Sequence, residues 1–193
     1  MKKLNKAYYQ QKNVVALACD LLGKKLCTYI DGIFTAGIIT ETEAYAGAND
    51  KASHAYNNKR TPRNEVMYHE GGKSYVYLCY GLHHLFNVVT NIKDVPHAVL
   101  IRAIKPVDGI EHILKRRKQT KLAKNTSGGP GTAAQALGIS TKLNGVDLSK
   151  TIIWIEDAGI TFTKKQISIT PRIGVDYAGE DAKLPYRFLV KEL

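Results

Sequence analysis

The sequence has few cysteines and no long hydrophobic run. Its 3 cysteines are scattered without a C-x-x-C pair, which argues against a disulfide framework and a zinc site and fits a reducing compartment. The longest apolar runs, residues 14–19 and 152–155, are far shorter than the ~20 residues that a membrane-spanning helix needs. The basic residues 1–3 are followed by polar residues where a signal peptide would have its apolar stretch. We therefore expect neither secretion nor a membrane partner.

Acidic residues are also scarce. The chain has 17 Asp and Glu against 28 Lys and Arg, a formal net charge of +11. Nucleic acid is the obvious partner for such a surface, although many soluble proteins are basic without a specific reason. With 44% hydrophobic and 23% charged residues, the 193-residue chain has the composition of a globular protein rather than a disordered one. Its length predicts a single domain over residues 1–193.

Periodicity and turn residues predict short elements of both kinds. Apolar residues at helical spacing predict a helix within residues 12–26, which Gly23 is placed to stop, and further helices at 108–125 and 132–137. Runs rich in β-branched and aromatic residues predict strands at 27–45 (a hairpin turning at Asp31-Gly32), 74–79, 85–90, 97–104, 152–156, 166–170 and 186–191. The elements do not alternate as βαβ units. The expected fold class is therefore α+β, with a mostly antiparallel sheet, flanking helices and a protruding β-hairpin.

Three segments are candidates for function. Residues 46–64 are polar and turn-rich, and a loop of this length in a compact domain usually carries function. Six of the 11 tyrosines lie between residues 45 and 80. Tyrosines in strands are ordinarily packing residues, but in a basic protein aromatic rings can also stack unpaired bases while Lys and Arg neutralise phosphates. The third segment is the basic helix at 108–125, for which a solvated face is the ordinary explanation.

Several short motifs follow one another along the chain. They are Glu41-Thr42-Glu43-Ala44-Tyr45, His54, Thr61-Pro62-Arg63-Asn64, Tyr75-Val76-Tyr77 with Tyr80-Gly81, Asn87, Leu100-Ile101-Arg102-Ala103, Gly129-Pro130-Gly131, Gln135-Ala136-Leu137 and Arg172-Ile173-Gly174. In sequence and in order these motifs resemble the alkyladenine (3-methyladenine) DNA glycosylase family, over roughly residues 14–190. Linked motifs in register are far more specific than a lone signature.

The resemblance implies a monofunctional enzyme that flips a damaged purine out of duplex DNA and hydrolyses its N-glycosidic bond with water. Glu43 matches the general base, Arg102 a residue that holds the flipped nucleotide's phosphate and helps to fix the water, and the main-chain carbonyl of Ile173 a further water ligand. The residues alone leave alternatives open. Glu41 shares the predicted strand face of Glu43, a surface carboxylate paired with a lysine would explain Glu43, and an internal salt bridge would explain Arg102.

The resemblance also implies how the base is held. Tyr45 and Tyr77 match the aromatics that sandwich the flipped base, and His54 matches the residue that closes the pocket and hydrogen-bonds the purine edge. Asn87 matches a side chain that crowds the exocyclic amine of guanine. Tyr80 matches the wedge that fills the space vacated in the minor groove. The alternatives are a structural histidine and a tyrosine folded onto its own strand.

Phosphate contacts are expected from Lys59, Arg63 and the basic series at 115–124. One departure from the family concerns Thr132, because a lysine or arginine commonly follows the Gly-Pro-Gly motif, so this phosphate contact is in doubt. Nothing in the sequence asks for a metal, a flavin or a nucleotide cofactor, and no lysine is required as a Schiff-base nucleophile.

The implied partner is double-stranded DNA containing damaged purines, bound by a monomer. In a bacterium the resemblance implies a cytoplasmic, nucleoid-associated enzyme. Two alternatives remain at this stage. The chain could be a non-catalytic nucleic-acid-binding module of the same fold, or it could recognise RNA through exposed tyrosines. The order of the residues does not rank the lesions.

Overall fold

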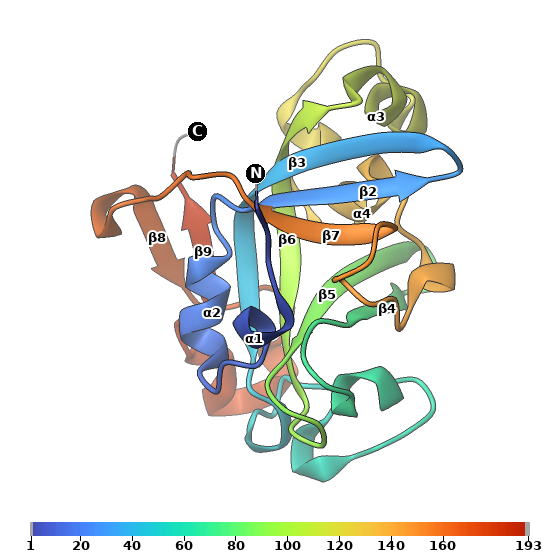
Figure 1. Cartoon of the computed structure of the whole chain (residues 1–193). Helices are drawn as coiled ribbons and strands as arrows, with labels where there is room; N and C mark the ends of the chain where they lie inside the picture. Colours follow the sequence, from blue (N-terminus) through green and yellow to red (C-terminus); the bar gives the residue numbers. More distant parts are fainter. Residues whose placement is uncertain (1, 192–193) are drawn as a thin grey trace.

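The computed structural model describes residues 2–191 and contains one large antiparallel sheet (Figure 1). Its strands are β1 Lys2–Lys3, β2 Lys25–Ile30, β3 Ile33–Tyr45, β4 Ser74–Cys79, β5 His83–Thr90, β6 His97–Asp108, β7 Ile153–Asp157, β8 Ile167–Thr170 and β9 Arg187–Val190. They are ordered β1-β7-β2-β3-β6-β5-β4, and β9 pairs with both β3 and β8. The predicted α+β class with a mostly antiparallel sheet is confirmed.

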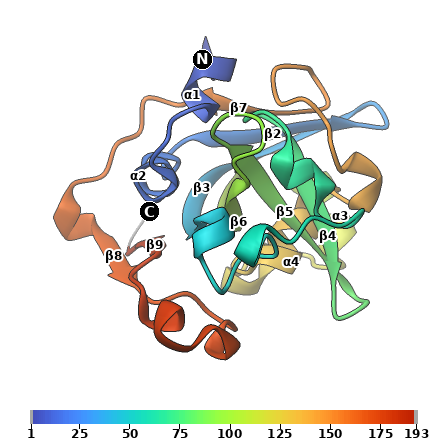
Figure 2. The same ribbon diagram turned by 90° about the horizontal axis from the view of Figure 1, so that it is seen from below.

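Short helices lie on both sides of this sheet. The α-helices are α1 Lys6–Tyr9, α2 Val14–Asp20, α3 Ile110–Arg117 and α4 Pro130–Ala136. Short 3₁₀ helices form at Gly47–Asn49, Tyr56–Asn58, Glu65–Tyr68, Lys124–Thr126, Thr141–Leu143, Lys164–Gln166 and Asp176–Lys183. Helices α1 and α2 lie on the near side in Figure 1, α3 and α4 lie behind, and the view from below in Figure 2 shows the same separation. In the described part of the chain, no helix is both long and apolar enough to cross a membrane.

Helix α2 is shorter than the segment 12–26 within which a helix is predicted. It begins at the Asn13 cap, whose side chain accepts a hydrogen bond from the Ala16 amide, and it ends at Asp20. The chain then turns at Gly23, which has φ +83°, and a Cβ there would lie 2.5 Å from the carbonyl oxygen of Ile160. The turn at Gly23 is where the sequence predicts the helix to stop, and Leu26 beyond it is a buried strand residue that pairs with Ile155 of β7.

The basic helix predicted at 108–125 is also too long. Helix α3 spans Ile110–Arg117 and stops where Lys118 adopts a left-handed conformation with φ 52°. Asp108 belongs instead to β6, where it pairs with Ala36 of β3. Only Ile113 of this helix is buried, so little apolar packing is available to extend it.

Other predicted boundaries shift by smaller amounts. The second hairpin turns more tightly than expected, since β5 begins at His83 rather than at residue 85. Strand β6 runs four residues beyond the predicted end at 104. The loop at 46–64 contains short 3₁₀ helices, and the N-terminal β1 and α1 were not predicted. The turn at Asp31-Gly32 is confirmed, with φ 53° and 76°, as a two-residue hairpin of this type requires.

The pairing of β3 with β6 is irregular where the functional side chains lie. Glu41 pairs with Ala103 but Thr42 pairs with Ile101, so Arg102 is an extra residue on β6. Such a bulge re-aims a side chain, and bulges are common next to active sites. At the same level β3 changes its other neighbour from β2 to β9, with Glu43 opposite Arg187.

Candidate active site

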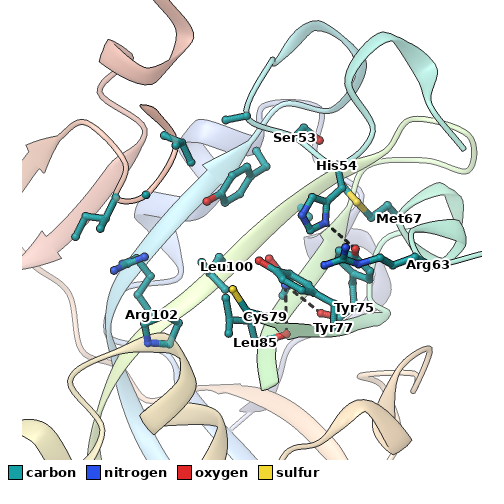
Figure 3. A pocket seen from close by; sticks show the side chains of 18 of the residues that line it. Ser53, His54, Arg63, Met67, Tyr75, Tyr77, Cys79, Leu85, Leu100 and Arg102 are labelled. Carbon is teal, nitrogen blue, oxygen red and sulfur yellow. Dashed lines mark hydrogen bonds between the residues drawn. The ribbon is translucent and has the colours of Figure 1, made fainter. Parts of the chain in front are cut away.

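A cavity of 510 Å³ opens between the end of β3, the β4–β5 hairpin, the loop after β3 and the segment around residues 173–177 (Figure 3). This volume falls within the roughly 300–1,000 Å³ of ordinary small-molecule sites. Of the residues singled out in the sequence, the lining includes Tyr45, His54, Arg63, Tyr77, Tyr80, Asn87, Arg102 and Ile173. Segments that are far apart in sequence thus meet at one hollow.

Aromatic rings form much of one wall. The rings of His54 and Tyr77 are 4.7 Å apart between centroids at an angle of 71°, and those of Tyr75 and Tyr77 are 5.4 Å apart. Tyr45 borders the same cavity from β3, while the guanidinium of Arg63 lies 5.4 Å from the Tyr77 ring centroid. A flat, uncharged ring system placed here would meet aromatic side chains from two different strands.

The side chain of His54 is held by Tyr75, for which the sequence predicts no role. Its Nδ1 lies 2.8 Å from the hydroxyl oxygen of Tyr75, and Figure 3 shows the two side chains pointing toward each other. Burial, together with the positive charge of Arg63, lowers the pKa of His54 to about 4. Burial also raises the pKa of Tyr75 to about 12. Both groups are therefore neutral near pH 7, and Nε2 of the imidazole is available to a ligand.

The depressed pKa of His54 predicts a pH-dependent contribution to stability. The unfolded chain binds this proton near the ordinary value of 6.5 and the folded protein only near 4, so stability falls as pH drops between these values. The buried His97 is shifted in the same direction and adds to the effect. In His54→Gln we expect the loss of melting temperature relative to wild type to be largest at pH 7.5 and to shrink toward pH 4. Parallel curves from thermal denaturation over this range would contradict the assignment.

Glu43 lies behind the cavity wall with its side chain completely buried, at 0% exposure. Its Oε1 accepts a hydrogen bond from the Ile173 amide at 2.8 Å and lies 3.2 Å from Nη1 of Arg102. Its Oε2 accepts a hydrogen bond from the Tyr45 hydroxyl at 2.9 Å. All three partners line the cavity. The lysine-paired surface carboxylate, considered from the sequence, is not what the structure places here.

Arg102 joins the two glutamates of β3. The bulge directs its Nε to Oε1 of Glu41 at 2.8 Å, and Oε1 of Glu41 also accepts a hydrogen bond from Nε of Arg187 at 2.6 Å. Two carboxylates thus face two guanidinium groups, which offsets the cost of burying the charges. The internal salt bridge left open by the sequence is present, and Arg102 also borders the cavity. Glu41 serves this ion-pair cluster and has no contact with Tyr45 or Ile173 comparable to those of Glu43.

A second ion pair supports Tyr45 from behind. Arg172 donates hydrogen bonds from Nη1 and Nη2 to the two carboxylate oxygens of Asp50, at 2.5 and 2.8 Å. Its guanidinium carbon lies 4.8 Å from the centroid of Tyr45 and 5.3 Å from that of Tyr186. The pair is almost completely buried, with 0% and 1% exposure. No local signal in the sequence points to Asp50, which lies in a polar loop, and Arg172 is singled out only as part of a motif.

The other singled-out residues occupy distinct positions. Asn87 is buried at the cavity, and its side-chain amide donates a hydrogen bond to the Tyr75 carbonyl oxygen at 3.1 Å. Tyr80 is 89% exposed at the tip of the protruding hairpin and has φ 51°, so the tyrosine is not folded onto its own strand. Ile173 reaches Glu43 through its amide; this contact does not involve the carbonyl that the resemblance singled out.

The expected phosphate ligands lie in three places. Lys59 is exposed outside the cavity lining, whereas Arg63 borders the cavity beside Tyr77. The basic series at 115–124 lies on and after α3. Thr132 stabilises the start of α4, because its hydroxyl accepts a hydrogen bond from the Gly129 amide and donates one to the Gly129 carbonyl oxygen. Within residues 2–191 no group of three or more His, Cys, Asp and Glu side chains is arranged to hold a metal ion.

Comparison with known proteins gives a consistent result. The family model described as methylpurine-DNA glycosylase (MPG) matches residues 7–193. A protein of Chlamydia pneumoniae, named "Putative 3-methyladenine DNA glycosylase", is 47% identical over 188 residues, which cover 97% of this chain and 94% of that protein. A protein of the same name from Bacillus cereus (strain G9842) is 44% identical over 192 residues, covering 95% and 93%. The resemblance that the motifs carry is thereby confirmed.

Proposed function

We propose, from the premise that the chain belongs to the methylpurine-DNA glycosylase family, that it flips alkylated or deaminated purines out of duplex DNA and hydrolyses their N-glycosidic bonds with a water activated by Glu43. Membership in the family makes the chain a DNA glycosylase, a hydrolase of N-glycosyl bonds that takes part in DNA repair. The finer statement is supported most directly by one observation, the three donors from cavity-lining residues that hold the Glu43 carboxylate directly behind the wall.

These donors leave one position of the carboxylate open. A carboxylate offers about four acceptor positions, two on each oxygen. Oε1 of Glu43 meets the Ile173 amide and Arg102, while Oε2 meets only the Tyr45 hydroxyl. The second position of Oε2 can therefore accept a proton from a water, which then attacks the sugar carbon as hydroxide character develops. Arg102, which lies beside the same carboxylate and borders the cavity, holds the phosphate of the flipped nucleotide and helps to fix the water.

One carboxylate suffices for this chemistry. An alkylated purine that carries a positive charge is already a good leaving group, so the second carboxylic acid of an O-glycosidase is not needed. A deaminated purine is neutral and depends more on hydrogen bonds to its edge. His54 is neutral near pH 7 and presents Nε2 to the cavity, where it can bond that edge. The substrate class therefore includes 3-methyladenine, hypoxanthine and ethenoadenine.

The remaining proposed roles concern how the site holds the flipped base and the DNA around it. Tyr45 and Tyr77 stack the everted base, a contact worth about 1–3 kcal/mol per base. Asn87 at the buried end disfavours the exocyclic amine of guanine. Tyr80 wedges into the minor groove, for which its 89% exposure at the hairpin tip is suited. Lys59 and Arg63 neutralise phosphates, and a monomer carries every group named here.

A lesion panel tests the proposal. The protein is incubated with duplexes that carry hypoxanthine or ethenoadenine, with alkylated DNA that contains 3-methyladenine, and with undamaged duplex, and abasic sites are then cleaved by alkali. We expect alkali-dependent breaks at the damaged purines only, and no breaks before alkali, because no lysine nucleophile takes part. Selective binding without any base release would instead identify a non-catalytic binding module. Stronger competition by single-stranded RNA than by lesion duplex would favour RNA recognition.

A further inference from the structure

A second hollow lies on the other side of the protruding hairpin. This groove of 620 Å³ runs between the β4–β5 hairpin and the helices α3 and α4. It is lined by Leu82, His83 and His84 from the hairpin, by Arg116 of α3, and by Gly131 and Gln135 of α4, among others. None of these residues borders the lesion cavity. The lining is cationic and hydrogen-bonding, and it includes no carboxylate.

Two glycines shape the groove around its polar groups. A Cβ at Gly131 would lie 3.0 Å from the Cβ of His83, so the bare backbone lets the hairpin pack against α4. A Cβ at Gly138, which has φ +73°, would lie 2.9 Å from the guanidinium carbon of Arg116. The guanidinium therefore lies directly against bare backbone, and the position of this charge is set by the fold rather than by a freely moving side chain.

The charge of Arg116 is unbalanced. Nη1 donates hydrogen bonds to Oγ1 of Thr35 and to the carbonyl oxygen of Ala136. No carboxylate among residues 2–191 lies within ion-pair distance of it. Burial lowers the pKa of Arg116, and the carboxylate of Asp31 opposes this only in part. A half-buried cation with neutral partners is costly unless an anion from outside completes the site.

The hairpin itself indicates which anion this is. Tyr80 and Leu82 are 89% and 76% exposed at its tip, Tyr80 facing the lesion cavity and Leu82 the groove. Pro130 and Gly131 are consecutive, yet one borders each hollow. The minor groove of DNA is about 6 Å wide and has one sugar-phosphate backbone on each side. A hairpin wedged into it therefore has the damaged strand on one flank and the undamaged strand on the other.

We propose that the groove beside Arg116 binds a backbone phosphate of the undamaged strand, opposite the lesion. The guanidinium supplies the positive charge, and the imidazoles of His83 and His84 supply hydrogen-bond donors from the hairpin. This contact would hold the duplex on both flanks of the wedge and favour double-stranded over single-stranded substrate. The inference rests on the proposed function, because it needs a lesion duplex with the hairpin in its minor groove.

The test removes one phosphate charge at a time from the DNA. Neutral methylphosphonates are placed singly along the undamaged strand of a hypoxanthine duplex, and the dissociation constant is measured at fixed salt for wild type and Arg116→Gln. For wild type we expect the affinity for the duplex to fall about tenfold when the methylphosphonate is at one or two adjacent positions, as for the loss of other hydrogen bonds to charged groups. Arg116→Gln should bind the unmodified duplex about tenfold more weakly and lose nothing further at those positions.

A matched control and a second substrate complete the design. Lys164→Gln also removes one positive charge, from an exposed residue before β8, and should keep the position-specific loss. Binding of a single-stranded lesion oligonucleotide should be the same for Arg116→Gln and wild type. Uniform loss along the strand, or the same position-specific loss in Arg116→Gln as in wild type, would overturn the inference alone. Failure of wild type to prefer lesion duplex over undamaged duplex would overturn the proposed function with it.

Discussion

Glu43→Gln is expected to bind lesion duplex about as tightly as wild type and to release the base about 10²- to 10⁴-fold more slowly, the range typical for loss of a general base. The amide has nearly the same shape as the carboxylate and can still accept the hydrogen bond from Ile173. It cannot take a proton from water at neutral pH. Single-turnover release of hypoxanthine, with binding measured on the same oligonucleotide, separates the two effects.

Glu41→Gln is the matched control, since it makes the same chemical change two residues away on β3. Glu41 bonds Arg102 and Arg187 and does not contact the Ile173 amide or the Tyr45 hydroxyl. We expect this variant to be less stable but to release the base at a rate much closer to that of wild type. Normal base release by Glu43→Gln, or a larger loss of release rate in Glu41→Gln, would show that Glu43 is not the general base.

The sequence places these two glutamates on one strand face but does not by itself distinguish between them. Strand periodicity placed both on one face, and their contacts with Arg102 show that they do lie together. Which of them lies next to Tyr45 and Ile173 depends on a bulge on β6 and on a segment 130 residues away in sequence. Neither follows from local propensity. The resemblance named Glu43, and the hydrogen bonds supply the physical distinction.

The prediction of the fold was right where local chemistry sets an element and wrong where tertiary pairing sets its boundary. Strands bounded by turn residues, such as the hairpin at Asp31-Gly32, follow from local chemistry and were found where expected. The predicted start of the basic helix was wrong, because Asp108 pairs with Ala36 of β3, which is distant in sequence. Tertiary pairing decided this boundary over helical periodicity. The partners of functional residues, such as Tyr75 for His54, were likewise invisible until the chain was folded.

Asp50→Asn is expected to lower the melting temperature by about 10 °C, because it removes one partner of a buried ion pair. Such losses cost about 3–5 kcal/mol, and each kcal/mol corresponds to about 2–4 °C in a domain of this size. Asparagine keeps one acceptor oxygen but turns the other into an NH2 donor that faces a nitrogen of the guanidinium, and Arg172 is left as an uncompensated charge at 0% exposure. The Asp50 carboxylate also accepts hydrogen bonds from the amides of Ala46 and Ala52. Thermal denaturation at neutral pH measures the effect.

Glu180→Gln provides the comparison, because its partner Lys183 and Glu180 itself are 75% and 85% exposed. An exposed pair contributes about 0–1 kcal/mol, so its melting temperature should stay within a few degrees of wild type. The Asp50 variant should also release bases more slowly at temperatures where it is still folded, since Arg172 packs behind Tyr45 and precedes Ile173, the amide donor to Glu43. Equal melting temperatures for the two variants would mean that the buried pair supports neither the fold nor the stacking face.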